Sequence, residues 1–487
     1  MTPSREPRYP GAMWALIPVL ETLWIVGIAI WILFERRSPV ATIAWIMVLS
    51  LLPLVGLPVY LLLGPRRFKR RKLRHAAAQG AARRLGARAH EDLSRAAKEP
   101  ARSLMALCEG AAGRPARPRR AEIEIYSAGR EQYVALEQAI DEARHHVHME
   151  YYIWQPDRIG IRIRNRLVER AKAGVEVRVL VDGFGSSKAP DLFWRSLREA
   201  GGRVERFNAL NLSRLRWRPR LTNFRTHRKI AVIDGVVGFT GGMNITDVHT
   251  AEYSGAAAWR DTHLRLCGPA VRGLQMVFCE GWHYVTGCTL ESRSYFPPPG
   301  ERCGAQLPVQ VVASGPDENS NAVHKLYVAA VTRAARRVLL TSAYFVPDRP
   351  LLTALVSAAL RGVDVRILVP ARSDLRIVGA ASRSYYPDLI EMGVRVFEYG
   401  PAMLHAKTLV VDDAVAVVGT ANADPRSFFL NFEVVVASYQ PEVSDRLAGL
   451  FEADLASATE VTAASVEQAG IMRRLVQNAA RPLSPML

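Results

Sequence analysis

A ten-residue pattern that occurs twice is the feature that most constrains the fold of this chain. The two copies are THRKIAVIDG, residues 226–235, and LHAKTLVVDD, residues 404–413. Each copy holds a histidine, one spacer, a lysine, four spacers and an aspartate. The surrounding chain repeats as well, and the aligned segments are 143–157 with 334–348, 173–181 with 361–369 and 201–207 with 392–398. We therefore expect two related halves that each carry one copy.

Each half shows the same order of predicted elements. Runs of β-branched residues are separated by gaps of helix length, so the expected order is strand, helix, strand, helix, strand and then the doubled pattern. This alternation predicts α/β units with largely parallel central strands. The halves are predicted to span residues 121–307 and 308–487, the second with a helical C-terminal tail.

Two apolar stretches precede the halves. Residues 11–34 are apolar apart from Glu21, and residues 40–64 carry no charge. Each stretch is long enough to provide the ~20 residues that cross a bilayer as a helix. Because only residues 35–39 separate them, we expect a transmembrane hairpin over residues 1–64. A pair of buried core helices is the alternative, but soluble helices of this length rarely lack a polar face.

Positive charge is concentrated in the connector that follows. The formal net charge of the chain is +18, and residues 66–120 hold 17 Lys and Arg against 4 Asp and Glu. The connector begins with RRFKRRKLR, residues 66–74. The positive-inside rule then places the rest of the chain in the cytoplasm, and such a cluster also attracts anionic lipid headgroups. A stop-transfer signal without lipid preference is the alternative. Residues 65–120 are predicted to form a juxtamembrane helix and a linker.

The remaining body carries little net charge, and this bears on its partner. Residues 121–487 have a net charge of only +4, whereas a nucleic-acid-binding domain needs a strongly basic face. An anionic membrane is therefore the expected partner. One basic stretch, residues 208–226, fits a loop that lies over the active site at the membrane interface, or alternatively an exposed basic strand.

The cysteines give no sign of a disulfide framework or a zinc site. There are five, an odd number, and none forms a CxxC pair. We therefore expect buried free thiols in a reducing compartment.

The doubled pattern supplies two imidazoles and two ammonium groups. Alternate side chains of a strand share a face, so His227 points with Lys229, and His405 with Lys407. Two such half-sites suit a phosphodiester, because one histidine can attack phosphorus while the other protonates the leaving alkoxide. The lysines would neutralise the non-bridging oxygens. The expected intermediate is a phosphohistidine.

Further polar residues follow each copy. Small residues precede Asn244 and Asn422, which would let the backbone approach phosphate while the amides donate hydrogen bonds to it. Each histidine should also need a carboxylate to fix its tautomer, and Asp261 and Glu433 are the candidates. The motif aspartates, Asp234 and Asp412, are open between a catalytic role and a role in capping the turn.

These motifs resemble those of the phospholipase D superfamily. The pattern HxK(x)4D(x)6GxxN is its signature and matches in both halves. Three longer segments and the N-terminal region resemble bacterial cardiolipin synthases more closely, and they are residues 226–247, 259–275, 418–433 and 33–46. The resemblance implies a duplicated phospholipase D-like α/β fold with two pseudo-symmetric halves, preceded by an N-terminal two-helix transmembrane hairpin.

The resemblance also implies an activity and a location. Two phosphatidylglycerols would give cardiolipin and glycerol, without a metal or any other cofactor. The protein would lie in the bacterial inner membrane, multi-pass, with its catalytic domain on the cytoplasmic side. Phosphatidylglycerol and the anionic membrane would be its partners, while the oligomeric state stays open.

The resemblance assigns roles to residues of this chain. His227 would be the nucleophile and His405 the acid and base, with Lys229, Lys407, Asn244 and Asn422 on the phosphate. Glu433 lies 28 residues after His405, which matches the superfamily spacing of the histidine-orienting acid, and Asp261 lies 34 residues after His227. Gly242 departs from the family pattern, which often has serine there, so we expect altered hydrogen bonding at the phosphate.

Three other functions are compatible with parts of the sequence. A membrane-anchored phospholipase D would deliver phosphatidyl to water or to another alcohol by the same machinery. A nuclease of the same superfamily fits less well with a body of low net charge. A non-catalytic membrane scaffold would have no need for intact histidines and lysines in both halves.

Overall fold

The computed structural model describes most of the chain. The described residues are 11–34, 39–52, 54, 56–57, 60, 97, 99, 101–113, 116–208, 224–298, 303–304, 307–316, 321–468 and 470–482. They fall into two compact units, one formed by Met1–Phe68 with Asn211–Asn223 and the other by Lys69–Leu210 with Phe224–Leu487. The basic cluster at 66–74 and most of the basic stretch at 208–226 lie outside the described residues.

The first unit contains helix α1, Gly11–Leu33, and helix α2, Pro39–Leu51. The two helices pack against each other, and the indole Nε1 of Trp24 donates to the backbone oxygen of Leu49 at 3.2 Å. Within the described residues, no helix combines the length and the apolar character that crossing a membrane requires. The predicted transmembrane hairpin therefore stays a prediction.

The first half forms a mixed sheet with strand order β4-β3-β2-β6-β7-β8-β1. The strand bounds are β1 Arg119–Tyr126, β2 His146–Tyr151, β3 Glu176–Asp182, β4 Arg203–Phe207, β6 Lys229–Ile233, β7 Val237–Gly241 and β8 His263–Cys267. Strands β2, β3 and β4 are parallel to one another, as predicted. The remaining pairs are antiparallel.

The second half repeats this order as β12-β11-β10-β13-β14-β15-β9, with β16 added beside β12. Its bounds are β9 Leu307–Ser314, β10 Arg337–Ser342, β11 Asp364–Pro370, β12 Arg395–Tyr399, β13 Lys407–Val411, β14 Val415–Gly419, β15 Asn431–Ser438 and β16 Ala458–Val461. The duplicated α/β fold is thus confirmed. The expectation of largely parallel strands is only partly correct, because β6 and β13 each lead through a short turn into the next strand, and a turn of that length joins antiparallel neighbours.

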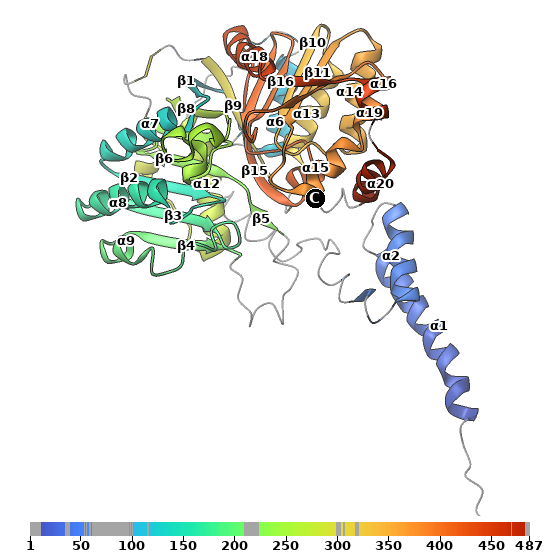
Figure 1. Ribbon diagram of the computed structural model, residues 1–487. Helices are drawn as coiled ribbons and strands as arrows, with labels where there is room; N and C mark the ends of the chain where they lie inside the picture. Colours follow the sequence, from blue (N-terminus) through green and yellow to red (C-terminus); the bar gives the residue numbers. More distant parts are fainter. Residues whose placement is uncertain are drawn as a thin grey trace, which may run out of the picture. The chain divides into compact units, whose positions relative to one another are not determined.

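One continuous sheet runs through both halves, which lie side by side in Figure 1. Strands β1 and β9 join them as an antiparallel pair, in which Arg119 is opposite Val309. Strand β5, Arg225–Thr226, lies off the main order and pairs with β15 of the other half.

Helices cover the sheet in matching positions in the two halves. Their bounds are α7 Gly129–Asp141, α8 Arg158–Lys172, α9 Arg195–Glu199, α11 Ala251–Ser254, α12 Val271–Thr286, α13 Ala322–Thr332, α14 Arg349–Leu360, α15 Arg376–Arg383, α16 Tyr386–Glu391, α17 Pro425–Phe429, α18 Pro441–Leu455, α19 Ala463–Glu467 and α20 Ile471–Ala480. Leu274 of α12 and Leu447 of α18 share one hydrophobic core with Val311 and Val434. The halves are therefore joined by common packing as well as by the sheet.

Helix α6, Ala101–Ala112, lies upstream of the boundary predicted near residue 121. Its Leu104 and Cys108 are buried in the core of the second half, beside Val312. The side chain of Gln310 donates to the backbone oxygen of Met105 at 2.9 Å. Ordered packing of the catalytic body thus begins before the predicted linker, whose last residues already belong to β1.

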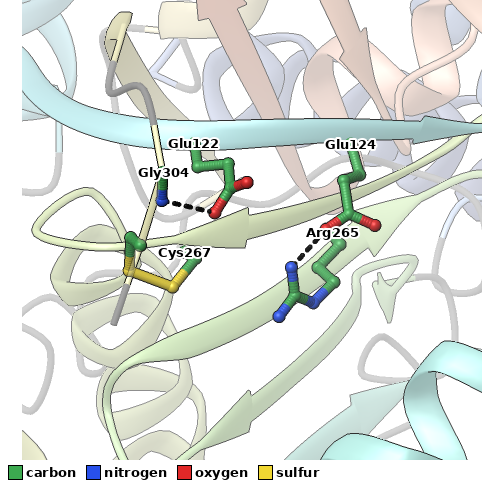
Figure 2. The surroundings of a disulfide bond; sticks show 6 residues. Glu122, Glu124, Arg265, Cys267 and Gly304 are labelled. Carbon is green, nitrogen blue, oxygen red and sulfur yellow. Dashed lines mark hydrogen bonds and ion pairs between the residues drawn. A yellow bond between two sulfur atoms is a disulfide. The ribbon is translucent and has the colours of Figure 1, made fainter. Parts of the chain in front are cut away.

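The prediction of buried free thiols is wrong at three of the five cysteines. Cys267 and Cys303 form a disulfide with a Cα–Cα distance of 5.6 Å, while Cys108 and Cys279 are free and buried, and Cys288 is free and exposed. Figure 2 shows the disulfide at the end of β8, where the backbone of Gly304 donates to Glu122 at 3.0 Å. The two cysteines are 36 residues apart in the sequence, so their pairing could not be predicted from spacing. They meet only because the folded chain passes close to the end of β8 again.

Candidate active site

The two histidines lie just before equivalent strands. Lys229 begins β6 and Lys407 begins β13, and each histidine comes two residues earlier. Lys229 is paired with Tyr151 at the end of β2, and Lys407 with Ser342 at the end of β10. Because β2 and β10 end beside parallel strands, both half-sites lie at the carboxyl edges of their parallel strands, where loops of α/β folds usually form sites.

Backbone pairing carries each histidine into the opposite half. The backbone N–H of His227 donates to the oxygen of Phe432 at 2.9 Å, next to the parallel pairing of β5 with β15. Likewise, the backbone N–H of His405 donates to the oxygen of Arg260 at 2.7 Å. Phe432 and Arg260 directly precede the two candidate acids, Glu433 and Asp261. The local pairing thus sets each histidine beside the acid of the other half.

The side chains complete this crossed arrangement. His227 Nδ1 lies 3.0 Å from both carboxylate oxygens of Glu433, and His405 Nδ1 lies 2.6 Å from Asp261 Oδ2. Both acids are fully buried. The sequence offered both acids as candidates, and in the structure each one contacts the histidine of the other half. With Nδ1–H donated to a carboxylate, Nε2 of each ring is the nitrogen with the lone pair.

Burial dominates the protonation of the histidines. It lowers the pKa of His227 to about 4, an effect that Glu433 opposes and that Lys229 and Lys407 reinforce. The pKa of His405 is lowered well below its usual value, first by burial and then by Lys407, Lys229 and His227. Residues of the two halves therefore act on each other's charge. These lowered pKa values favour the neutral form of both imidazoles at neutral pH.

The lysines are buried as well, and each is held by its own strand. Lys229 Nζ donates to the backbone oxygen of His227 at 2.8 Å, and Lys407 Nζ donates to that of His405. Burial lowers the pKa of Lys229 to about 7 and that of Lys407 to about 8, although Glu433 and Asp261 raise them in part. A phosphate bound between these lysines would carry negative charge, and a nearby negative charge favours the protonated form of both ammonium groups.

The two asparagines of the signature are buried. Asn244 Oδ1 accepts from the backbone N–H of Ile153 at 3.2 Å, which leaves its NH2 group to donate elsewhere. The backbone N–H of Asn422 donates to Ser427 Oγ at 3.1 Å. Asn422 Oδ1 is buried and has no hydrogen-bond partner in the described part of the chain. The Asn244 side chain is thus held by a neighbour, whereas at Asn422 only the backbone is, and both side-chain amides retain capacity for a ligand.

The hydrogen bonds of Asp234 and Asp412 favour the turn-capping role over the catalytic one. The Asp234 carboxylate accepts from the backbone N–H groups of Arg144, His145 and His146, at 2.8–2.9 Å. Asp412 does the same for the three residues that lead into β10, at 2.8–2.9 Å. Both aspartates sit at positive φ in the turn at the far end of their strand. They tie the turn to the start of a neighbouring strand.

One cavity of about 340 Å³ borders Asp234 and is lined also by Glu124, Tyr126 and Arg265. It lies at the end of β6 opposite to His227, and the five residues of β6, roughly 16 Å at ~3.3 Å per residue, separate the two. The cavity is therefore separate from the histidine site.

Three buried ligand-type side chains meet within the site, but their hydrogen bonds do not suit a metal ion. Ligand atoms of His249, Asp261 and His405 lie within 4.8 Å of one another. His249 Nε2 accepts from the backbone N–H of Asn244 at 3.1 Å. The neutral ring must then carry its proton on Nδ1, the nitrogen that would face the metal. The two neighbouring lysines oppose a cation further.

Sequence reasoning missed several residues of the site. Thr420 Oγ1 donates to Glu433 Oε2 at 2.5 Å, and His249 lies 3.7 Å from Asp261 through Nδ1. The rings of Tyr152 and Trp259 lie 5.0 Å from His227 and 5.2 Å from His405, respectively. Thr420 occupies a variable position in the GxxN part of the signature, and the other three lie outside it. Of these residues, only Thr420 could have been found from the sequence. It lies two positions before Asn422, and an alignment of the two halves places it opposite Gly242.

Comparisons with known proteins agree with this architecture. A family model described as "Cardiolipin synthase, PLD-like domain" matches residues 136–253 and 327–455, and one described as "Phospholipase_D-nuclease N-terminal" matches residues 22–65. The solved structure of a phosphatidylserine synthase from Haemophilus influenzae superimposes with a TM-score of 0.59 at 14% identity, covering 79% of this chain and 100% of that one. That likeness concerns the fold.

Full-length relatives are more similar. A cardiolipin synthase from Geobacillus sp. (strain WCH70) is 38% identical over 98% of this chain and 95% of its own. A cardiolipin synthase from Geobacillus thermodenitrificans is 39% identical with the same coverage. With crossed histidine–acid pairs in a duplicated fold and similarity along nearly the whole chain, this protein belongs to the cardiolipin synthase family of the phospholipase D superfamily.

Proposed function

We propose that this protein is a cardiolipin synthase that transfers a phosphatidyl group from one phosphatidylglycerol to another and releases glycerol. The observation that carries the proposal is the crossed pairing of His227 with Glu433 and of His405 with Asp261. It gives one site two oriented imidazoles, which is what a double displacement at phosphorus requires. The similarity to cardiolipin synthases over 98% of the chain identifies the substrate class.

In the first step, His227 Nε2 attacks the phosphorus of phosphatidylglycerol. The bond from phosphorus to the headgroup oxygen breaks, and His405, protonated in the complex, gives its proton to the departing glycerol. The negative phosphodiester raises the proton affinity of His405 on binding, which offsets the effect of burial. Lys229 and Lys407 face the non-bridging oxygens, where the transition state concentrates charge.

In the second step, His405 acts as the base. It takes the proton from a glycerol hydroxyl of a second phosphatidylglycerol, and that oxygen attacks phosphorus as the bond to His227 breaks. The products are cardiolipin and the free imidazole. Glu433 stabilises the positive charge that His227 carries while it is bonded to phosphorus, and Asp261 does so for His405 when it holds the proton. Asn244 and Asn422 would hold the phosphate through their NH2 groups.

The N-terminal region would hold the enzyme at the membrane. Residues 11–34 and 40–64 carry one charge between them, and the second family model covers residues 22–65. We propose that they form a hairpin in the bacterial inner membrane, with the catalytic body on the cytoplasmic side next to the basic residues 66–74. If so, the full chain should resist alkaline extraction from membranes, and its body should be protected from protease in intact spheroplasts. Extraction by alkali or cleavage from outside would contradict this topology.

Product analysis tests the activity. The purified full-length protein, given vesicles of phosphatidylglycerol alone, should form cardiolipin and glycerol in equal amounts, and His227→Ala should form neither. Phosphatidic acid without cardiolipin would instead identify a phospholipase that uses water. A product that appears only when another alcohol is added would identify a different acceptor.

A further inference from the structure

Exposed apolar side chains gather on the C-terminal helix α20. Ile471, Met472, Leu475 and Val476 are each between 56% and 78% exposed. Their spacing places them in one stripe along the helix, because residues one and four positions apart are neighbours on its surface. At 100° per residue, Arg473 and Arg474 fall on the two sides of this stripe. The helix contains no acidic residue.

Helix α20 is fixed to the catalytic body beside α15, as Figure 1 shows. The Arg481 guanidinium that follows it lies 4.5 Å above the Tyr385 ring and pairs with Asp388 at 2.7 Å. Leu375, the residue before α15, and Ile377 of α15 are also exposed. The α15–α20 face is defined here by the apolar residues Leu375, Ile377, Ile471, Met472, Leu475 and Val476 with the exposed Arg372, Arg376, Arg473 and Arg474.

This face borders the active-site edge of the second half. Helix α15 follows the carboxyl end of β11, and that edge also holds Lys407. Asp374, just before α15, accepts from the hydroxyl of Tyr344 at 2.8 Å, and Tyr344 follows the strand that pairs with Lys407. Burial lowers the pKa of Lys407, and Asp374 is among the charges that oppose this shift. The face and the site are thus neighbours.

We infer that the α15–α20 face docks on an anionic lipid bilayer, with its apolar side chains among the lipids and its arginines at the headgroups. Apolar residues bordered by arginines are typical of helices that lie in a membrane interface. Docking there would bring the active-site edge to the phosphates of its substrate. The inference rests on the proposed function, because only a lipid substrate requires this placement.

The test separates docking from chemistry. In the full chain, Ile471→Glu with Leu475→Glu should reduce turnover of long-chain phosphatidylglycerol in vesicles by about 10-fold or more, since the charges oppose insertion. Turnover of short-chain phosphatidylglycerol below its critical micelle concentration should stay at the wild-type level. The matched control is Leu360→Glu at the end of α14, which is equally exposed but precedes β11 and lies at the opposite edge.

Three results would overturn the inference. Unchanged vesicle turnover in the double variant would show that the face does not dock. Equal losses on both substrates, or an equal loss in Leu360→Glu, would show a general defect. A changed oligomeric state with vesicle turnover intact would assign the face to contacts between copies of the chain. If the wild type turns over neither form of phosphatidylglycerol, the proposed function fails instead.

A second inference comes from the difference between the two orienting acids. Glu433 receives a hydrogen bond from Thr420, but the corresponding residue of the first half is Gly242, which has no side chain. A Cβ at Gly242 would lie 1.9 Å from Asp261 Oδ1. The shorter Asp261 thus occupies the space of the missing hydroxyl group; the backbone N–H of Thr262 donates to its Oδ1 at 2.7 Å, but it lacks a side-chain donor equivalent to Thr420.

His249 lies where this donor is needed. It corresponds to Ser427, and both accept a backbone N–H at 3.1 Å, from Asn244 and Asn422 respectively. A backbone N–H can only donate, so His249 Nε2 is unprotonated and the neutral ring carries its proton on Nδ1. His249 Nδ1 is buried, faces Asp261 Oδ2 at 3.7 Å, and has no hydrogen-bond partner among the residues described.

We propose that His249 is a positioning residue that directs its Nδ1–H at Asp261 and so replaces the hydroxyl missing at Gly242. It would hold the Asp261 carboxylate in line with His405 while that ring gains and loses its proton. The two half-sites would then differ in a way suited to their different tasks, since Asp261 serves the histidine that exchanges protons.

Two substitutions distinguish this role from a merely structural one. His249→Ser keeps an acceptor for the Asn244 backbone, as Ser427 does for Asn422, but removes the donor to Asp261. We expect kcat to fall about 10-fold with little change in KM or melting temperature, because a charged hydrogen-bond partner is lost. His249→Gln offers both an acceptor and a donor and should recover part of kcat. Wild-type kcat in His249→Ser, or equal kcat in the Ser and Gln variants, would overturn the proposal.

Discussion

At the scale of single residues, burial sets the charge of the site before any substrate arrives. Removing an ammonium group from water disfavours its charged form, so the pKa of Lys229 falls to about 7 and that of Lys407 to about 8. The buried carboxylates Glu433 and Asp261 restore part of this loss. A phosphodiester restores more, so substrate binding and lysine protonation should reinforce each other.

The lysine pKa values predict an alkaline loss of substrate capture. As the pH rises through about 7 to 8, the free enzyme loses ammonium charge, and kcat/KM should fall. The two groups interact, so the measured pKa belongs to the pair. In Lys229→Arg the guanidinium keeps its proton and the remaining Lys407 has a pKa of about 8, so the fall should move to higher pH even if the maximum is lower. A pH profile of kcat/KM for both proteins tests this, and identical alkaline limbs would contradict it.

The motif aspartates should matter for stability and not for chemistry. Asp234→Ala removes the acceptor of three backbone N–H groups and places alanine at a φ of 53°, so we expect a loss of about 1–3 kcal/mol in the free energy of unfolding. Asp234→Asn tolerates this φ and should lose less. Urea unfolding gives these values. A large fall in kcat of the folded Asn variant, with stability retained, would return Asp234 to the catalytic set.

Sequence reasoning at this scale succeeded where chemistry needs a fixed spacing. A histidine and a lysine two apart on a strand must share a face, so both pairs could be predicted. The same spacing cannot tell whether the aspartate after a strand faces a substrate or the backbone of a neighbouring strand. His249 was out of reach because its role depends on a glycine seven residues earlier and on an acid twelve residues later.

At the scale of elements, register determines which acid meets which histidine. β5 continues parallel to β15, and the backbone of His227 bonds to that of Phe432, so Glu433 comes next to the ring of His227. Arg260 of the first half and Leu404 of the second form the matching parallel bridge. This bridge brings Asp261 next to the ring of His405. Spacing along the chain predicted acids in suitable strands. It could not predict the crossing, which depends on pairing between residues 206 and 144 positions apart.

Close packing at Gly419 should make β14 sensitive to one methyl group. A Cβ there would lie 2.5 Å from the backbone oxygen of Val434, next to Glu433. Gly419→Ala should therefore displace β15, cost about 1–3 kcal/mol in unfolding free energy and lower kcat. Gly449→Ala in α18 is the control, because no atom lies within 4 Å of its Cβ and alanine favours helices. Equal stability and kcat for the two variants would show that this contact is unimportant.

At the scale of the whole molecule, the duplication produces one site from one chain. The sheet is continuous through β1 and β9, and helices α12 and α18 share a core with both halves. The internal repeat predicted two related halves, and the structure confirms this. The repeat did not predict that α6 packs into the second half. The sequence of α6 lies within the basic connector and has no counterpart in the repeat.

A single-chain site makes a prediction about mixtures. His227→Ala and His405→Ala each leave one histidine–acid pair intact, but no chain then holds both pairs. Co-expressed in one cell, the two variants should form no cardiolipin above the level of either alone, because no chain can complement the other. Lipid analysis of cells without other cardiolipin synthases measures this. Restored synthesis would show that half-sites come from different chains.

The covalent step provides the most direct test of the central claim, that imidazoles from the two halves act on one phosphorus atom. The full-length protein is mixed with phosphatidylglycerol labelled at phosphorus, quenched in base during turnover, and mapped by mass spectrometry. We predict a phosphorus adduct on the peptide that contains His227, present in the wild type and absent in His227→Ala, which should also lack turnover. Turnover that continues in His227→Ala, or an adduct on a residue outside the two histidines, would contradict the account.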